Sequence, residues 1–288
     1  MTATGSCAST DPRTAPYQPH PNLPYKRLSF VLRQPEPPMH RLSDPDCPLD
    51  LPPGFELVTL REHGDAFAHA CAVAQEAGAG TLVWVRRYDL VEFAVVLEPE
   101  EPLASARRAH FAAMNAIGDA ISAHCPPERQ VSFRWPDKAL FDEGLLGGAQ
   151  LGWPQDCAET EVPAWLVCGV MLRSADMMHV DTGLSPDGTS LMGEGFELVD
   201  TEALIGSFAR HLMTGFDRWK EHGFKAVAET FFQRLPKGKA GERRGIDTNG
   251  DLLVHAPLDK GPPERTPLVA ALAKADWYDR AHRAPKLG

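Results

Sequence analysis

One stretch of the sequence decides the fold, and it reads RWPDKALFDEGLLGG over residues 134–148. It joins two segments with strand character, residues 130–135 and residues 145–153. Two strands joined by so short a connection predict a β-hairpin. Gly147 and Gly148 lie within the second strand, where glycine lets either a bound ligand or another part of the chain approach closely. The stretch therefore predicts a hairpin with a close contact on one face.

The segments on either side of this hairpin alternate between strand and helix character. Apolar residues at three- to five-residue steps predict helices, and short apolar runs predict strands. The expected strands are residues 55–60, 81–85, 91–97, 165–172 and 251–254, and the expected helices are residues 66–78, 103–124, 201–220, 225–235 and 267–280. Strands in hairpin-like pairs among helices predict an α+β fold, with a mixed sheet packed against helices.

Composition and charge exclude several classes of protein. Hydrophobic residues make up 43% and charged residues 24% of the 288 residues, which is typical of a globular protein with a packed core. The apolar runs are too short to cross a bilayer, and the first residues lack the pattern of a secretion signal. The formal net charge of −10 repels phosphate backbones. We therefore expect neither a membrane nor nucleic acid as a partner.

The six cysteines are scattered along the chain without a Cys-x-x-Cys pair, which argues against a structural zinc site. Free thiols are typical of a reducing compartment, so we expect a cytoplasmic location. Cys168 lies in an apolar strand with no histidine nearby in sequence, and we interpret it as a small buried hydrophobic residue rather than a nucleophile. His179 and Asp181 are too few to define a metal site.

The chain divides into three parts. Residues 1–53 hold twelve prolines, which predicts an extended arm rather than a domain. Residues 54–236 carry the alternating strands and helices of the expected core. Residues 237–288 begin with a basic linker and contain the turn Thr248-Asn249-Gly250 before a late strand. We expect this last part to be a small C-terminal module followed by a tail.

Three segments, taken in order, resemble biotin/lipoate protein ligases. The first is Arg134-Trp135-Pro136-Asp137 followed by Gly147-Gly148, which is similar to the family's Lys-Trp-Pro-Asn, hairpin and Gly-Gly. The second is the helix of residues 201–219 with its exit Gly223-Phe224, and the third is residues 244–253, similar to the opening of the family's C-terminal barrel. The resemblance implies the α+β fold of biotin protein ligases and class II aminoacyl-tRNA synthetases, with a small, reduced C-terminal β module.

The resemblance also implies a reaction and its participants. Members of this family join the carboxylate of a small acyl group to AMP and then pass the acyl group to a lysine of a carrier domain. The implied cosubstrate is ATP with Mg²⁺, the implied substrate is biotin or lipoate, and the implied partner is a biotinyl or lipoyl carrier domain, with no resident metal. The crowded negative charge of such a reaction requires cationic groups and backbone N–H donors.

The resemblance implies a site centred on Arg134, which stands where the family has a lysine. The expected site is a catalytic Arg134 with the substrate-binding residues Arg86, Arg87, Trp135, Pro136, Asp137, Gly147 and Gly148. An arginine can clamp a carboxylate or phosphate through two parallel hydrogen bonds. The alternatives are that Arg134 pairs with a surface acid, that Trp135 and Pro136 only pack, and that the two neighbouring arginines point to opposite faces of a strand, so that at most one faces a pocket.

Three departures from the family pattern bear on activity. Residues 86–90, where the family has its ligand-binding loop, contain no glycine and cannot wrap a phosphate in the usual way. A second family lysine falls on Leu145, and the family's asparagine falls on Asp137. We therefore weigh a ligase against a degenerate relative that binds an acyl group, a nucleotide or a carrier domain without chemistry. A third hypothesis is a scaffold that recruits partners through the proline-rich arm.

Overall fold

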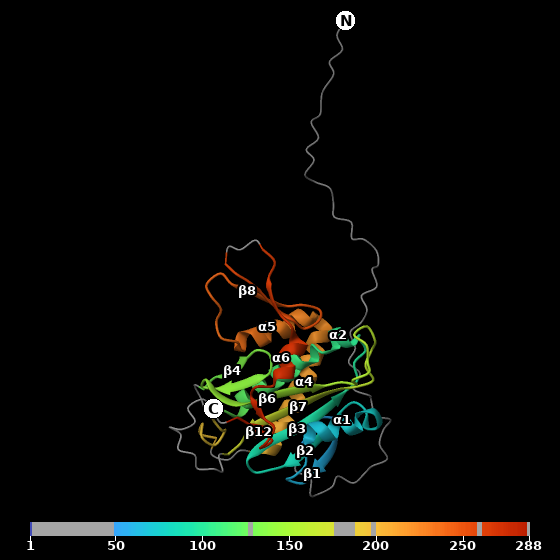
Figure 1. Ribbon diagram of the computed structural model, residues 1–288, viewed down its shortest axis with the longest axis vertical. Coiled ribbons are helices and arrows are strands. Elements are labelled where there is room, and N and C mark those ends of the chain that lie inside the picture. The colour runs from blue at the N-terminus through green and yellow to red at the C-terminus, as the bar shows by residue number, and fades with distance from the viewer. Residues whose placement is uncertain (2–48, 126–128, 176–187, 197–199, 258–260, 287–288) are drawn as a thin grey trace.

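The computed structural model describes residues 1, 49–125, 129–175, 188–196, 200–257 and 261–286. Most of the expected arm of residues 1–53 lies outside the described residues. The described part is built around one mixed sheet packed against helices, as the sequence predicts, and the helices lie on both of its faces (Figure 1). None of the described helices is both long and apolar enough to cross a membrane.

The central sheet has seven strands in the order β1-β2-β3-β7-β6-β5-β4. Its members are β1 (Glu56–Leu60), β2 (Thr81–Arg86), β3 (Leu90–Leu97), β4 (Val131–Arg134), β5 (Lys138–Phe141), β6 (Gly144–Gly152) and β7 (Leu166–Arg173). β1 and β2 run parallel, and all the other neighbours are antiparallel. The predicted hairpin is a three-stranded meander, because residues 138–141 form a strand of their own between β4 and β6.

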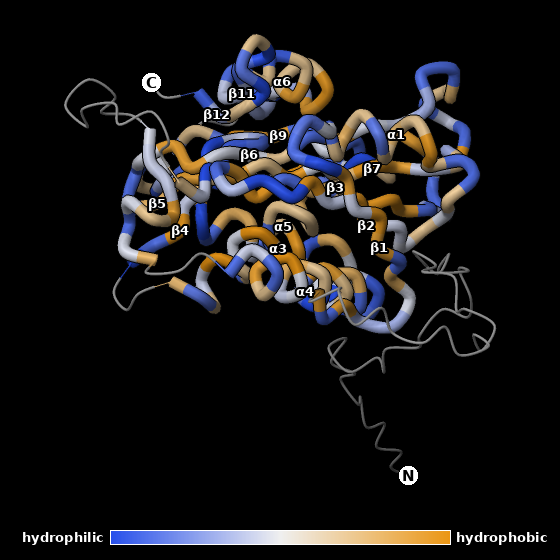
Figure 2. The backbone as a smooth tube through the Cα atoms, turned by 90° about the horizontal axis from the view of Figure 1, so that it is seen from below, coloured by the Kyte–Doolittle hydropathy of each residue, from blue (hydrophilic) through white to orange (hydrophobic). Residues whose placement is uncertain are grey.

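Helices cover both faces of the sheet (Figure 2). On one face, which we call the three-helix face, lie α3 (Ala109–His124), α4 (Thr201–His222) and α5 (Phe224–Arg234). The other face, which we call the α1 face, carries α1 (Ala66–Ala77). β3 and β7 are buried along their whole length, because a central strand with both faces covered has no side turned to water.

The helix expected over residues 103–124 is broken in two. α2 (Leu103–Ala106) and α3 are separate helices. At their junction the backbone N–H groups of Arg108 and Phe111 bond to carbonyl groups three residues back, at 3.1 and 3.0 Å. Bonds of this spacing belong to a tighter 3₁₀ turn, which redirects the chain.

The C-terminal module is smaller than the sheet and ends in a hairpin. It consists of β8 (Arg243–Ile246), β9 (Leu252–His255), β10 (Glu264–Thr266), α6 (Leu268–Lys274), β11 (Tyr278–Asp279) and β12 (Ala284–Pro285). The helix expected over residues 267–280 stops at Lys274, because Ala275 adopts a left-handed conformation with a φ of 36°. The following residues, 276–285, which we call the C-terminal segment, lie on the α1 face against β6 and β7 (Figure 2).

Candidate functional site

A single row of residues crosses the sheet on the α1 face. The strand register pairs Glu92 with Met171, Met171 with Gly148, Gly148 with Lys138, and Lys138 with Arg134. Residues directly opposite each other in neighbouring strands point to the same side of a sheet. The row therefore brings together two expected site residues, Arg134 and Gly148, with two that sequence reasoning missed, Glu92 and Lys138.

A β-bulge in β6 brings Leu145 to the same face as this row. The register between β5 and β6 shifts at this point, so that Leu146 has no partner in β5 and packs into the three-helix core. A bulge adds one residue to one strand. Leu145 and Gly148 are three positions apart, so strict alternation along a strand would put them on opposite faces. Because of the bulge, both face the α1 face, and Leu145 packs against the cluster that contains Met171.

The C-terminal segment covers the row, with Trp277 at its centre. The Trp277 side chain is 1% exposed, and a Cβ atom added at Gly148 would lie 2.6 Å from its ring. The Nε1–H group of Trp277 donates a hydrogen bond of 2.9 Å to Oδ2 of Asp137. The missing side chain at Gly148 is therefore what lets the indole ring lie directly on the sheet.

The carboxyl group of Asp137 is only partly ionised at neutral pH. It is buried, and burial raises the pKa of its carboxyl to about 7, although the hydrogen bond from Trp277 and the nearby Lys138 favour the charged form. At neutral pH this carboxyl is therefore partly protonated. The acid that replaces the family's asparagine is therefore not a fixed anion at neutral pH.

Asp137 should give the protein a pH-dependent stability. In the unfolded chain an aspartate loses its proton near pH 4, whereas the folded carboxyl keeps it up to about pH 7. The folded state then binds more protons between these values, so the free energy of unfolding falls as the pH rises from about 4 to about 7, by up to roughly 4 kcal/mol. His110, whose pKa burial lowers to about 4, makes stability rise over part of this range, so the difference between the parent and Asp137→Asn in urea unfolding at pH 5 and pH 8 measures the fall.

The matching variant is Asp137→Asn, which keeps an acceptor for Trp277 and has no titratable proton. Its stability should be nearly the same at pH 5 and pH 8, apart from changes shared with the parent. Asp217→Asn, at an exposed position of α4, is the control and should keep the parental pH dependence. An Asp137→Asn protein with an unchanged pH dependence would contradict this assignment.

Lys138 places a positive charge beside Gly148. Its Nζ atom lies 2.7 Å from Oδ1 of Asp276 in the C-terminal segment, and its side chain is 21% exposed. The hydrogen bond from Lys138 lowers the pKa of the Asp276 carboxyl. Lys138 directly follows Arg134-Trp135-Pro136-Asp137 in the sequence, but only the strand register shows that it lies opposite Gly148.

Glu92 lies buried at the other end of the row. Its Oε1 atom accepts a hydrogen bond of 2.9 Å from the N–H of Ala66, the first residue of α1. Among the described residues its Oε2 atom has no hydrogen-bond partner and lies 3.7 Å from Nη1 of Arg87. Burial raises the pKa of Glu92. A cavity of about 10 Å³, room for one water molecule, lies beside it beneath Trp277 and Tyr278.

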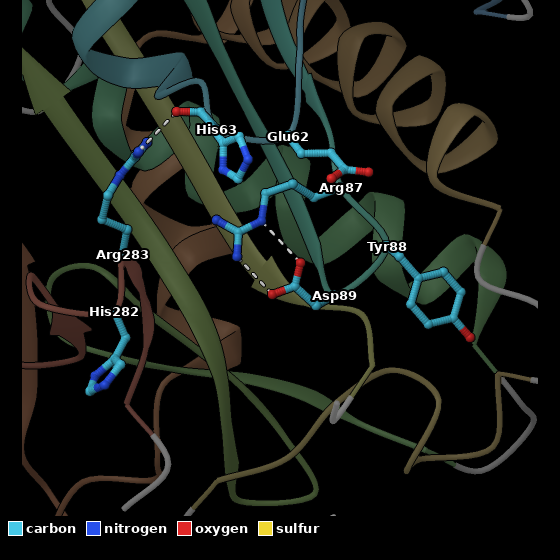
Figure 3. A pocket seen from close by; sticks show the side chains of 7 residues that line it. All are labelled: Glu62, His63, Arg87, Tyr88, Asp89, His282 and Arg283. Carbon is cyan, nitrogen blue, oxygen red and sulfur yellow. Dashed lines mark hydrogen bonds and ion pairs between the residues drawn. The ribbon is translucent and has the colours of Figure 1, made fainter. Parts of the chain in front are cut away.

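An open groove of about 550 Å³ lies between the β2–β3 connection and the C-terminal segment (Figure 3). Its lining residues are Glu62, His63, Arg87, Tyr88, Asp89, His282 and Arg283. Figure 3 shows the Arg87 guanidinium turned toward Asp89, to which it donates two hydrogen bonds of 3.0 and 2.7 Å. Arg86 instead lies over the ring of Trp84 at 5.1 Å and lines a different groove. The two arginines therefore serve different surfaces, and Arg87 is already paired.

The remaining motif residues divide between the surface and the core. Arg134 is exposed at the edge strand and has no hydrogen bond or ion pair within the described part of the chain. Trp135 stacks on Phe111 with ring centres 5.1 Å apart. Burial lowers the pKa of His110 to about 4, so its ring is neutral, and its Nε2–H donates to the Pro136 carbonyl at 3.1 Å. Trp135 and Pro136 thus anchor the hairpin to α3.

Two further residues have packing roles. A Cβ atom added at Gly147 would lie 2.0 Å from the backbone oxygen of Met171, so this glycine allows close strand packing. Burial raises the pKa of Cys168 to about 12, which keeps the thiol protonated and unreactive.

His179 and Asp181 lie outside the described residues. The residues that are described contain no group of three or more metal-ligating side chains.

The sheet order and the two covered faces define the class of the fold, which is that of biotin protein ligases. A biotin protein ligase-like protein of unknown function from a Silicibacter species matches with a TM-score of 0.66 and 26% identity, over 77% of this chain and 98% of that one. The biotin protein ligase of Aquifex aeolicus matches with a TM-score of 0.57 and 15% identity, over 73% and 95%. The predicted fold class is confirmed.

Residues 51–233 match the Biotin/lipoate A/B protein ligase family, and the chain belongs to this family. The Biotin--[acetyl-CoA-carboxylase] ligase of Paracoccus denitrificans is 27% identical over 183 residues, which are 58% of this chain and 74% of that protein. The family predicted from the three segments is therefore confirmed. The matched residues contain the motif at residues 134–148 and all of α4, and they end before β8.

Proposed function

We propose that this protein is an acyl–protein ligase, which activates biotin or a lipoyl-type acid with ATP and transfers the acyl group to a lysine of a carrier domain. The observation that carries the proposal is the row on the α1 face, where Lys138 and Arg134 are aligned with Gly148. Lys138 beside Gly148, with Arg134 one strand further along the row, provides positive charge near the room that the glycine leaves for an acyl group. This arrangement replaces the family lysine that is missing at Leu145.

The chemistry of the first step explains why these cations are needed. A carboxylate oxygen of the acid attacks the α-phosphorus of ATP, a new P–O bond forms, and the bond to pyrophosphate breaks. The attack brings two anions together, so a nearby cation lowers the barrier. Lys138 is the better placed of the two, since it is adjacent to Gly148 in the register. Mg²⁺ enters as the counter-ion of ATP.

In the second step a neutral lysine amine of the carrier attacks the acyl carbonyl carbon. A C–N bond forms, the bond to AMP breaks, and AMP leaves as the phosphate anion while the amine gives up a proton. The groove of Figure 3 is lined by the carboxylate of Glu62 as well as by basic residues, while Asp89 is held by Arg87. Carboxylates favour the approach of a cationic lysine side chain. The name of the Paracoccus relative makes biotin and a carboxylase carrier domain the first candidates to test.

One observation favours a second candidate, a relative that binds the acyl group without activating it. Arg87, which lies 3.7 Å from Glu92 of the row, donates two hydrogen bonds to Asp89. The connection that contains it has no glycine to present backbone N–H groups to a phosphate. In this case the α1 face would hold an acyl group or its carrier, and ATP would not be consumed.

Measuring pyrophosphate release separates the two candidates. The full chain with Mg²⁺, ATP and biotin, lipoate or octanoate should release pyrophosphate with one of these acids and not without it. Titration calorimetry with each compound alone should show binding of ATP and of the same acid. An absence of ATP binding at millimolar concentrations would rule out the ligase, whereas acid binding without pyrophosphate release would establish the second candidate.

A further inference from the structure

The C-terminal segment occupies the groups that the proposed function assigns to the substrate. Trp277 donates to Asp137 and covers Gly148, and Asp276 pairs with Lys138. We propose that this segment is a displaceable internal occupant of the acyl site, which competes with the substrate for one binding surface. This inference rests on the proposed function for the identity of the site, and on the contacts of the segment for the competition.

The segment presents the chemistry of a small acid. The indole of Trp277 is a flat apolar ring with one N–H donor, and the carboxylate of Asp276, the residue before it, pairs with Lys138. A ligand that replaces both would have an apolar body with a ring N–H and a free carboxylate. Biotin has both groups, whereas lipoate and octanoate have the carboxylate alone. Biotin should therefore displace the segment better than a straight-chain acid.

Leu145 is the residue that makes this occupation favourable. Trp277 and Ala284 form a buried cluster with Met171 and Leu90, and Leu145 packs against it. A lysine at this position would place a charge, with the cost of its desolvation, against the indole ring. The same residue that departs from the family pattern thus provides an apolar surface for the segment.

The segment also borders two neighbouring spaces, the small cavity beside Glu92 and the open groove. Trp277 and Tyr278 form the roof of the small cavity beside Glu92, while Arg283 lines the open groove of Figure 3. The two spaces are neighbours, because Arg87 of the groove lies 3.7 Å from the unbonded oxygen of Glu92. Lifting the segment would join them into one chamber with buried polar groups at its end. A site of that form is what a small acid with polar ring atoms requires.

Beyond the buried contacts of Trp277 and the buried hydrogen bond that Arg173 donates to the Pro285 carbonyl, the attachments of the segment are of the kind that open locally. Its two strands contain two residues each, and Asp276 and His282 are largely exposed. Arg283 holds it to the chain before α1 by donating to the carbonyl groups of His63 and Gly64. Short strands and exposed polar contacts characterise the parts of a protein that open without global unfolding. The seven-stranded sheet below, by contrast, has whole strands buried.

The test uses the full chain and the double variant Asp276→Ala, Trp277→Ala. If the segment is closed most of the time, the variant should bind biotin at least about 10-fold more tightly than the parent in titration calorimetry. The control Arg280→Ala changes an exposed residue of the same segment that does not line the groove, and it should bind as the parent does. Equal affinities of parent and double variant would overturn the proposal.

Hydrogen exchange on the parent chain tests whether biotin displaces the segment, even if the double variant does not fold. Saturating biotin should speed the exchange of the backbone amides of Tyr278 and Lys286, which donate to the carbonyl groups of Ala275 and Trp277, and slow exchange in β3 and β7. Unchanged or slower exchange in the segment would overturn the proposal. If no acid binds either protein, the proposed function fails. The segment is then displaceable only if its amides exchange at least about 100-fold faster than those of β3, and equal protection refutes the inference.

Discussion

Replacing Lys138 by alanine is expected to slow pyrophosphate release about 100-fold or more, because loss of one group that stabilises developing charge typically costs 100- to 1,000-fold in rate. Lys138 lies opposite Gly148 on the α1 face, so no other lysine of the sheet takes its place. The measurement is the rate of pyrophosphate release from ATP at saturating acid. The effect should fall on the turnover number more than on the affinity for the acid.

Two comparisons make this result interpretable. Lys138→Arg keeps a cation at the same place and should recover part of the rate, and Lys225→Ala, at an exposed position of α5, should have the parental rate. Arg134→Ala should weaken acid or nucleotide binding with little change in melting temperature, since Arg134 is exposed and has no partner among the described residues. A Lys138→Ala protein with the parental rate would remove Lys138 from the reaction.

The second large effect concerns the support of the site. Phe111→Ala should lower the free energy of unfolding by about 3–5 kcal/mol, the usual cost of truncating a buried phenylalanine. Phe111 is fully buried and touches Trp135, Phe224 and Phe231 with ring centres 5.0 to 6.0 Å apart. The loss leaves a cavity beneath the start of the motif. Urea unfolding measures it.

The control for this prediction is Val162→Ala, which shortens an apolar side chain that is 53% exposed. It should change stability by less than about 0.5 kcal/mol, as is usual for surface positions. If Phe111→Ala were as mild as this control, the aromatic cluster would not be what holds the motif to α3. The binding measurements on Phe111→Ala should be made only below its unfolding transition.

The position of several candidate residues followed from local sequence. The motif predicted the hairpin and named Arg134, Asp137 and Gly148, all of which the structure places in or beside the row. Alternation along a strand also predicted that Arg86 and Arg87 face opposite ways, and they line different grooves. These features depend on neighbours in the chain, where the period of a strand fixes which side a residue faces.

Other residues were missed for reasons that differ. Glu92 gave a usable signal, since it is an isolated acid inside an apolar strand, and a lone buried carboxylate usually has a specific partner. Lys138 lies in the decisive stretch itself, but its alignment with Gly148 depends on a register that a bulge has shifted. Trp277 gave no signal, because its partner Asp137 is 140 positions away in sequence.

The sequence by itself determined the family, the alternation of strands and helices, and the absence of the family's glycine loop and second lysine. These follow from residue types and their local spacing, which every conformation of the chain shares. Only the tertiary structure decided that Glu92, Gly148, Lys138 and Arg134 form one row and that Trp277 lies on it. That contact forms when distant segments bury apolar surface together, and local spacing along the chain does not show which indole fills which space.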